Sequence, residues 1–266
     1  MEDILDRIIR TKRQEVEISK AQMPLNALQK IVDDIISKER MPKFSMKESL
    51  EKSHSGIISE FKRKSPSKGW IHENSSVEDI APAYARNGAS AISILTDRDY
   101  FGGDLGFIEK VRDDIHIPIL RKDFIIDEYQ LWEARKAGAN AVLLIAACLT
   151  KDTCRHLLHQ AHLLGLEVLL EIHDEKELDY LSPETDMLGV NNRNLGSFHT
   201  DVKKSFDIID KLPKEFTLVS ESGISSPDMV KSLRKVGYKG FLIGENFMKE
   251  DNPGKALQRF IQQIEN

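Results

Sequence analysis

Eight short runs of apolar, β-favouring residues recur from residue 57 onward, and segments of helical periodicity follow them. The runs span residues 57–62, 91–95, 117–122, 141–145, 167–172, 187–191, 216–221 and 240–244. Most are almost continuously hydrophobic, as is typical of parallel strands that are buried on both faces. The helical segments span residues 77–88, 105–113, 127–138, 151–165, 175–181, 202–212, 226–236 and 253–264. Eight consecutive units favour an α/β fold of the closed (β/α)8, or TIM, barrel class over a doubly wound open sheet.

Residues 1–56 precede the first predicted strand and have a different character. Apolar residues at helical spacing begin at Ile4 and again at Leu25, and Met23-Pro24 separates the two stripes. Because an apolar stripe needs a surface to cover, we predict an N-terminal helical extension that covers the rim at one end of the barrel. Residues 57–266 would form the barrel itself. No linker separates the two parts, so we expect one structural domain.

Composition narrows the classes of partner and compartment. The 266 residues include 38 basic and 43 acidic side chains, for a formal net charge of -5. This balance provides no basic field for nucleic acid or a membrane surface, so any anion must be held by a local site. The longest strongly apolar run, residues 141–149, is too short to cross a bilayer, and no secretory signal is recognisable. Cys148 and Cys154 fit neither a disulfide framework nor a zinc site, so we expect reduced thiols in the cytoplasm.

Polar and charged residues gather where the predicted strands end. Glu60 and Lys62 lie two apart at the end of the first strand and therefore face the same side. The third, fifth, sixth and seventh strands end with Lys122, Glu171, Asn191 and Glu221. In a barrel these ends meet at one rim, which is where active sites are built. A structural ion pair explains any single one, but selection for stability alone would not assemble several buried charges at one rim. We therefore predict that these six residues are catalytic.

Two glycine turns follow the last two predicted strands. Gly223 lies in the turn after the seventh strand, and Gly244 and Glu245 follow the eighth. Glycine lets backbone N–H groups approach a ligand closely, and the loops after strands seven and eight are the usual phosphate site of barrels. We predict a phosphate site formed by these two glycines, Glu245 and the charge of Lys62, although ordinary turns also use glycine.

Two other loops at the same rim offer further contacts. Residues 64–69, Lys-Ser-Pro-Ser-Lys-Gly, are rich in hydroxyl and turn residues and predict a loop that closes over a ligand. Residues 100–103, Tyr-Phe-Gly-Gly, offer aromatic surface after the second strand. A solvated turn without a role would have the same composition in both cases.

Four histidines bear on the question of a metal. His156, His159 and His162 lie opposite the apolar stripe of the fourth helix, so we expect them to be exposed rather than metal-bound. His173 lies beside Glu171, but side-chain alternation is expected to direct it away from the site. We therefore predict no metal site.

The strand-end residues lie in longer motifs. These are residues 58–69 (Ile-Ser-Glu-Phe-Lys-Arg-Lys-Ser-Pro-Ser-Lys-Gly), 119–125 (Ile-Leu-Arg-Lys-Asp-Phe-Ile), 169–172 (Leu-Leu-Glu-Ile), 189–195 (Gly-Val-Asn-Asn-Arg-Asn-Leu), 219–224 (Val-Ser-Glu-Ser-Gly-Ile) and 241–244 (Phe-Leu-Ile-Gly). Together they resemble the indole-3-glycerol-phosphate synthase family. The Glu-x-Lys-x-x-Ser-Pro-Ser stretch is specific, whereas Leu-Ile-Gly also occurs in other phosphate-binding barrels. The motifs span the whole predicted barrel, and the helical extension fits the family as well.

The resemblance implies an enzyme that converts 1-(2-carboxyphenylamino)-1-deoxyribulose 5-phosphate to indole-3-glycerol phosphate, carbon dioxide and water. This step of tryptophan biosynthesis combines ring closure, decarboxylation and dehydration, without metal or organic cofactor. Lys122 would act as general acid, and Glu171 and Glu60 would divide the acid and base roles of dehydration. Lys62 would hold a substrate anion. Other substrate contacts would come from Asn191, Arg193, Glu221, Ser65, Pro66, Phe101, Phe124, Leu143 and Ser222, and the phosphate would lie on Gly223, Gly244 and the backbone of Glu245.

Some alternatives remain open at this point. Glu245 sits where some relatives have serine, and we expect its carboxylate to point away from the phosphate. A Schiff-base aldolase would use Lys122 as a nucleophile instead of a proton donor. A catalytically silent barrel would bind a phosphorylated metabolite, but phosphate binding alone does not require Glu171. We expect a monomer whose partner is the small phosphorylated substrate.

Overall fold

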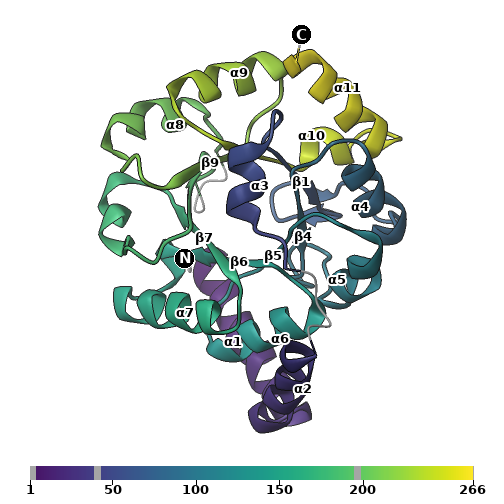
Figure 1. Ribbon diagram of the computed structural model, residues 1–266, viewed down its shortest axis with the longest axis vertical. Coiled ribbons are helices and arrows are strands. Elements are labelled where there is room, and N and C mark those ends of the chain that lie inside the picture. The colour runs from purple at the N-terminus through teal and green to yellow at the C-terminus, as the bar shows by residue number, and fades with distance from the viewer. Residues whose placement is uncertain (1–3, 39–42, 195–198, 266) are drawn as a thin grey trace.

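The computed structural model describes residues 4–38, 43–194 and 199–265. Eight parallel strands close into a barrel in the order β1-β10-β9-β8-β7-β6-β5-β4, and β1 pairs with both β10 and β4. The strands are β1 (Ile57–Phe61), β4 (Ala91–Leu95), β5 (Ile119–Lys122), β6 (Ala141–Ile145), β7 (Glu167–Ile172), β8 (Met187–Asn191), β9 (Thr217–Glu221) and β10 (Gly240–Ile243). Figure 1 shows them as a central ring surrounded by helices. The predicted barrel is confirmed, since pairing of β1 with β10 closes the sheet.

The helices between the strands form the outer layer (Figure 1). They are α4 (Val77–Arg86), α5 (Gly106–Val111), α6 (Glu128–Ala137), α7 (Lys151–Leu163), α8 (Lys203–Ile208), α9 (Pro227–Val236) and α11 (Pro253–Glu265), with the short α10 (Glu245–Met248) after β10. Short 3-10 segments add η1 (Arg112–Asp114), η2 (Ala146–Cys148) and η4 (Ile209–Lys211). Within the described ranges, no helix combines the length and the apolar character that crossing a membrane requires.

Three local predictions differ from the structure. Residues 175–181 form the 3-10 segment η3 (Glu175–Tyr180) rather than an α-helix, because Pro183 limits the segment to a length at which an α-helix is marginal. The third barrel strand begins at Ile119 instead of residue 117, since Pro118 has no N–H for the ladder. Residues 64–69 contain an antiparallel hairpin formed by β2 (Lys64–Ser65) and β3 (Gly69–Trp70).

The inward-facing rows of the barrel change from apolar to charged along each strand. Ile58, Leu120, Leu169 and Val219 belong to one buried apolar cluster inside the barrel. Two positions later along the same strands stand Glu60, Lys122, Glu171 and Glu221. Because residues two apart in a strand face the same side, these charges enter the same interior, nearer the C-terminal ends. The opposite faces of the strands pack on the helices in a second cluster.

The N-terminal segment contacts both ends of the barrel rather than one. Its helices are α1 (Ile4–Gln22), α2 (Leu25–Ser37) and α3 (Met46–Lys52). Figure 1 shows α3 lying across the ring of strands, where Met46 and Leu50 join the interior apolar cluster. At this end Glu167, the first residue of β7, accepts a hydrogen bond of 2.6 Å from the backbone N–H of Met46. At the other end Ile8 of α1 joins the same cluster.

A buried ion cluster holds α1 at the C-terminal ends of the strands. Nζ of Lys12 lies 3.0 Å from Oδ2 of Asp97, after β4, and 2.9 Å from Oδ1 of Asp123, after β5. Burial alone lowers the pKa of Lys12, but the neighbouring carboxylates raise it by more, so the pKa lies above its ordinary value. Arg121 also contacts Asp123, at 3.1 Å. Lys12 is therefore a permanent cation that ties the extension to two strand ends.

Replacing Lys12 with methionine should destabilise the protein by about 3–5 kcal/mol at pH 7, because Asp97 and Asp123 lose a buried partner. The deficit should shrink toward pH 5, since protonation removes the uncompensated charge from these carboxyl groups. Urea unfolding at both pH values measures it. The control is Lys20→Met, which removes the half-exposed Lys20–Asp127 pair and should cost less than about 1 kcal/mol. Equal losses in the two variants contradict the assignment.

Candidate active site

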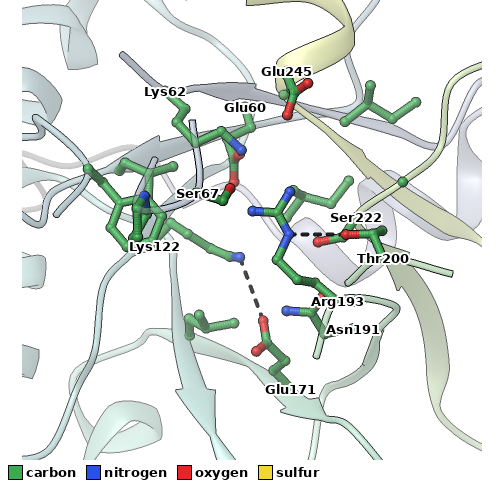
Figure 2. A pocket seen from close by; sticks show the side chains of 18 of the residues that line it. Glu60, Lys62, Ser67, Lys122, Glu171, Asn191, Arg193, Thr200, Ser222 and Glu245 are labelled. Carbon is green, nitrogen blue, oxygen red and sulfur yellow. Dashed lines mark hydrogen bonds and ion pairs between the residues drawn. The ribbon is translucent and has the colours of Figure 1, made fainter. Parts of the chain in front are cut away.

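A cavity of about 450 Å³ opens at the C-terminal ends of the barrel strands. It is lined by fourteen of the predicted residues: Glu60, Lys62, Pro66, Phe101, Lys122, Phe124, Leu143, Glu171, Asn191, Arg193, Ser222, Gly223, Gly244 and Glu245. Figure 2 shows Lys122 and Glu171 pointing toward each other, with Glu60 and Lys62 on one side and Arg193 on the other. The strand ends thus bring nearly all of the predicted set to one cavity, although their roles stay predictions.

Lys122 is the central cation of the cavity. Its Nζ lies 3.2 Å from Oε2 of Glu221 and 3.6 Å from Oε2 of Glu171. Burial alone lowers the pKa of this ammonium, but the surrounding carboxylates raise it more, so its pKa lies above the ordinary value. Lys122 is therefore protonated at neutral pH, and two carboxyl groups lie within 3.6 Å of its Nζ.

The two carboxyl groups around Lys122 have opposite shifts. Burial raises the pKa of Glu171, but Lys122, His173 and Asn191 together lower it more, so this group is a carboxylate. Burial raises the pKa of Glu221 to about 8, because Lys122 compensates only part of the desolvation and Glu171 repels a second negative charge. Glu221 is completely buried and does not line the cavity, so it contacts Lys122 from the interior of the barrel and not from the cavity.

Gly189 makes room for Glu221, a role that the sequence analysis did not assign. A Cβ atom at this position would lie 2.2 Å from Oε1 of Glu221. The glycine lies on β8 directly opposite Glu171 of β7 in the parallel register. The position therefore requires glycine, because the carboxyl group of Glu221 occupies the space that a side chain would need. No pattern in the sequence indicates this requirement.

A second ion pair lies on the wall formed by β1. Nζ of Lys62 is 2.8 Å from Oε1 of Glu60. Burial raises the pKa of Glu60, but the charges of Lys62 and Lys122 lower it below the ordinary value. A Cβ on Gly244 would lie 2.5 Å from Oε1 of Glu60, so this glycine leaves space for the carboxylate. Gly244 thus serves the charged wall as well as the turn after β10.

The turns after β9 and β10 form the predicted anion end of the cavity. Ser222 and Gly223 have φ angles of 69° and 78°, a left-handed conformation that is costly for serine and natural for glycine. Nε of Arg193 donates to Oγ1 of Thr200 at 3.3 Å, which directs the guanidinium into the cavity (Figure 2). Glu245 lines the cavity, and its carboxylate pairs with Lys68 of the loop after β1.

The apolar side of the cavity contains the predicted aromatic wall. The rings of Phe101 and Phe124 lie 6.1 Å apart, and Leu143 and Pro66 also line the space. Ser65 was placed wrongly: it is buried in β2 and does not line the cavity, whereas Ser67 does. The short hairpin reverses the chain after Ser65, which a loop prediction could not resolve.

Other lining residues were missed by sequence analysis. They are Leu5, Ile8, Ser67, Lys68, Leu95, Asp123, Ile145, Thr200, Ile224, Ser225, Leu242, Ile243, Asn246 and Lys249. Several follow a predicted site residue directly, so adjacency to the motifs was a usable signal. Leu5 and Ile8 come from α1, and their stripe indicated burial but not against which surface.

The histidine predictions had mixed outcomes. On α7, His156, His159 and His162 each face a different carboxylate, from Glu128, Glu184 and Asp186. Among the described residues, no group of three or more His, Cys, Asp or Glu is arranged to hold a metal ion. His173 does not line the cavity, as expected. Its Nε2 nevertheless lies 3.2 Å from Oε1 of Glu171, a contact that was not predicted, because residues two apart at a strand end share a side.

Comparison with known proteins identifies the family. Residues 5–260 match the family described as indole-3-glycerol phosphate synthase. The chain belongs to this family. A protein of that name from Bacteroides thetaiotaomicron is 53% identical over 265 residues, covering 100% of both chains. Another, from Burkholderia lata, is 42% identical over 262 residues, covering 98% of this chain and 100% of the relative.

A solved structure supports the fold alone. The 3-hexulose-6-phosphate synthase from Salmonella typhimurium aligns with a TM-score of 0.60 and 14% identity, covering 79% of this chain and 99% of that one. At this identity the likeness extends to the barrel but not to the chemistry of the site. Membership of the indole-3-glycerol phosphate synthase family is therefore shown by the sequence relatives, and the arrangement of the cavity by the structure.

The Glu221→Gln variant should be more stable than the wild type at pH 8, by more than about 1 kcal/mol, and similar to it near pH 4.5. A raised folded-state pKa gives stability that is complete below the unfolded pKa and is lost as pH rises toward about 8. The neutral amide avoids this loss. Urea unfolding across pH 4.5–8 is the measurement. A difference that does not change with pH contradicts the raised pKa.

Proposed function

We propose that this member of the indole-3-glycerol phosphate synthase family closes the indole ring in the cavity at the C-terminal ends of the strands. The substrate would be 1-(2-carboxyphenylamino)-1-deoxyribulose 5-phosphate, and the products indole-3-glycerol phosphate, carbon dioxide and water. The activity is that of a carboxy-lyase in tryptophan biosynthesis. One observation carries the assignment of roles: the buried, protonated Lys122 lies within 3.6 Å of two carboxyl groups whose pKa values are shifted in opposite directions.

Lys122 supplies the proton for the ring-closing step. The ring carbon that bears the carboxylate attacks the ketone carbon, and the electron pair of the C=O bond takes a proton from Nζ of Lys122. A permanently protonated ammonium suits this role, because it stabilises the developing alkoxide and completes the transfer. Loss of carbon dioxide then leaves its C–C electron pair in the ring and restores aromaticity. No cofactor participates in this sequence.

Dehydration requires a second acid and a base. Glu171, whose pKa is lowered, is the better base and removes a proton from the new five-membered ring. The Glu60–Lys62 pair, on the facing wall, protonates the departing hydroxyl group so that it leaves as water. Asn191 lies beside Glu171 and orients the substrate (Figure 2). The pKa values of both glutamates are lowered, so both are carboxylates, and Lys62 of the Glu60–Lys62 pair supplies the proton while Glu171 accepts one.

The phosphate lies on the turns after β9 and β10. The backbone N–H groups of Gly223, Gly244 and Glu245 are its donors, and Ser222 adds a hydroxyl group. Lys62 and Arg193 provide positive charge close by (Figure 2). The Lys68–Glu245 pair balances the carboxylate that would otherwise repel the phosphate. The aromatic part of the substrate lies against Phe101, Phe124 and Leu143.

The Schiff-base alternative is disfavoured by the same electrostatics. Amine attack on a carbonyl requires a neutral lysine, which enzymes obtain by lowering its pKa. The carboxylates around Lys122 raise its pKa instead. We also propose that the enzyme is a cytoplasmic monomer; the two cysteines are free thiols, which supports a reducing compartment such as the cytoplasm.

Lys122→Ala should lower kcat by about 10²–10⁴-fold, the range typical of a positioned proton donor. Purified protein is incubated with the carboxyphenylamino sugar phosphate, and indole fluorescence reports turnover. Lys136→Ala is the control, because Lys136 pairs with Glu109 on the outer surface and should leave kcat unchanged. Near-normal turnover by Lys122→Ala would show that Lys122 is not the proton donor. Borohydride trapping of the substrate on Lys122 of the wild-type protein would favour the aldolase.

A further inference from the structure

His173 stands behind Glu171, between two carboxylates. Its Nε2 lies 3.2 Å from Oε1 of Glu171, and its Nδ1 lies 3.5 Å from Oε2 of Glu177. The same Glu177 oxygen accepts a hydrogen bond of 2.5 Å from the backbone N–H of His173. His173 does not line the cavity. Any effect it has on the reaction must therefore pass through Glu171.

The chain that follows β7 is built to hold this ring in place. Asp174 caps η3 by accepting a hydrogen bond from the N–H of Lys176, which starts the turn directly after His173. Glu177 lies one turn later and points back to the histidine. Only 12% of the His173 side chain is exposed, so the two carboxylates are its main charged neighbours. The imidazole is thus fixed by two elements, the end of β7 and η3.

The charges around the ring favour its protonated form. Burial alone lowers the pKa of His173, but Glu171 and Glu177 together raise it by more, and the resulting pKa is about 9. Other charged or polar groups near this arrangement are Lys122, whose Nζ is 3.6 Å from the other oxygen of Glu171, Asp174, Asn191 and Lys204. Nζ of Lys204 donates to the backbone oxygen of Asn191 at 3.0 Å. An imidazolium between two carboxylates therefore balances charge at neutral pH.

We propose that His173, held by Glu177, is a positioning residue that fixes the carboxylate of Glu171 through Oε1 and leaves Oε2 facing Lys122 and the substrate. The inference rests on the proposed function of Glu171 as the base of dehydration. The terminal torsion of a glutamate is broad, so a carboxylate without a partner at Oε1 samples many orientations. His173 restricts it to the one in which Oε2 reaches the cavity.

The test uses two substitutions of His173 and a double-mutant cycle. His173→Leu removes the contact, whereas His173→Gln keeps an N–H donor near the position of Nε2. We expect His173→Leu to lower kcat roughly tenfold while KM changes less than about twofold, since the substrate does not touch the ring. His173→Gln should recover most of this loss. Glu177→Gln should lower kcat in the same direction by a smaller factor.

The cycle with Glu171→Gln shows whether His173 acts through Glu171. In the Glu171→Gln background, His173→Leu should have no further effect on kcat, because the group it orients is already inactive. Multiplicative losses in the double variant overturn the proposal, and so does a His173→Leu variant with normal kcat or with only a raised KM. If His173→Leu does not fold, His173→Gln and Glu177→Gln enter the same cycle. His159→Leu, on the outer face of α7, is the matched control and should keep wild-type kinetics.

The two proposals fail in different ways. A wild-type protein that produces no indole fluorescence from the substrate refutes the proposed function, whatever His173 does. An active wild type whose His173 and Glu171 substitutions act independently refutes only the positioning role.

Discussion

The buried ammonium of Lys122 is the interaction on which the rest of the catalytic end depends. Its burial is tolerable because the carboxylate of Glu171 lies 3.6 Å from it and the carboxyl group of Glu221 lies 3.2 Å from it, and removing Lys122 would leave Glu171 as an uncompensated buried charge. The three groups come from three strands, so their distances are set by the closure of the barrel. Gly189 completes the arrangement, since any side chain there would displace Glu221. The site is therefore inseparable from the strand register.

The barrel interior has two regions with different physical tasks. Apolar rows and α3 fill the N-terminal region and stabilise the fold through burial. At the C-terminal ends of the strands the same rows end in charged residues. Burying these charges lowers the stability of the fold, but it holds them in fixed positions around the cavity. Lys12 extends this charged layer to α1, whose Leu5 and Ile8 also line the cavity. The N-terminal segment is thus a wall of the site and not only a cover.

Much of this architecture could be predicted from sequence, because it depends on periodicity. Continuous apolar runs that alternate with helical periodicity, and the polar or charged residues at five strand ends, were sufficient to predict the barrel and the rim. Contacts that depend on exact three-dimensional position were not predictable. Ser65 and Ser67 are two apart in a loop, and only the hairpin decides which one faces the cavity. The contact between His173 and Glu171 was not predicted, although residues two apart in a strand face the same side. The Lys68–Glu245 pair joins residues that are far apart in the sequence, and no local pattern indicates that they are close.

The position of Lys12 has a consequence for the order in which the molecule is assembled. During synthesis α1 leaves the ribosome before Asp97 and Asp123, to which it is anchored, because these residues follow β4 and β5. This helix must therefore wait, with its lysine in water, until β4, β5 and the carboxylates that follow them have been made. Helix α1 is thus among the segments that reach their final place late, although it precedes every barrel strand in the sequence.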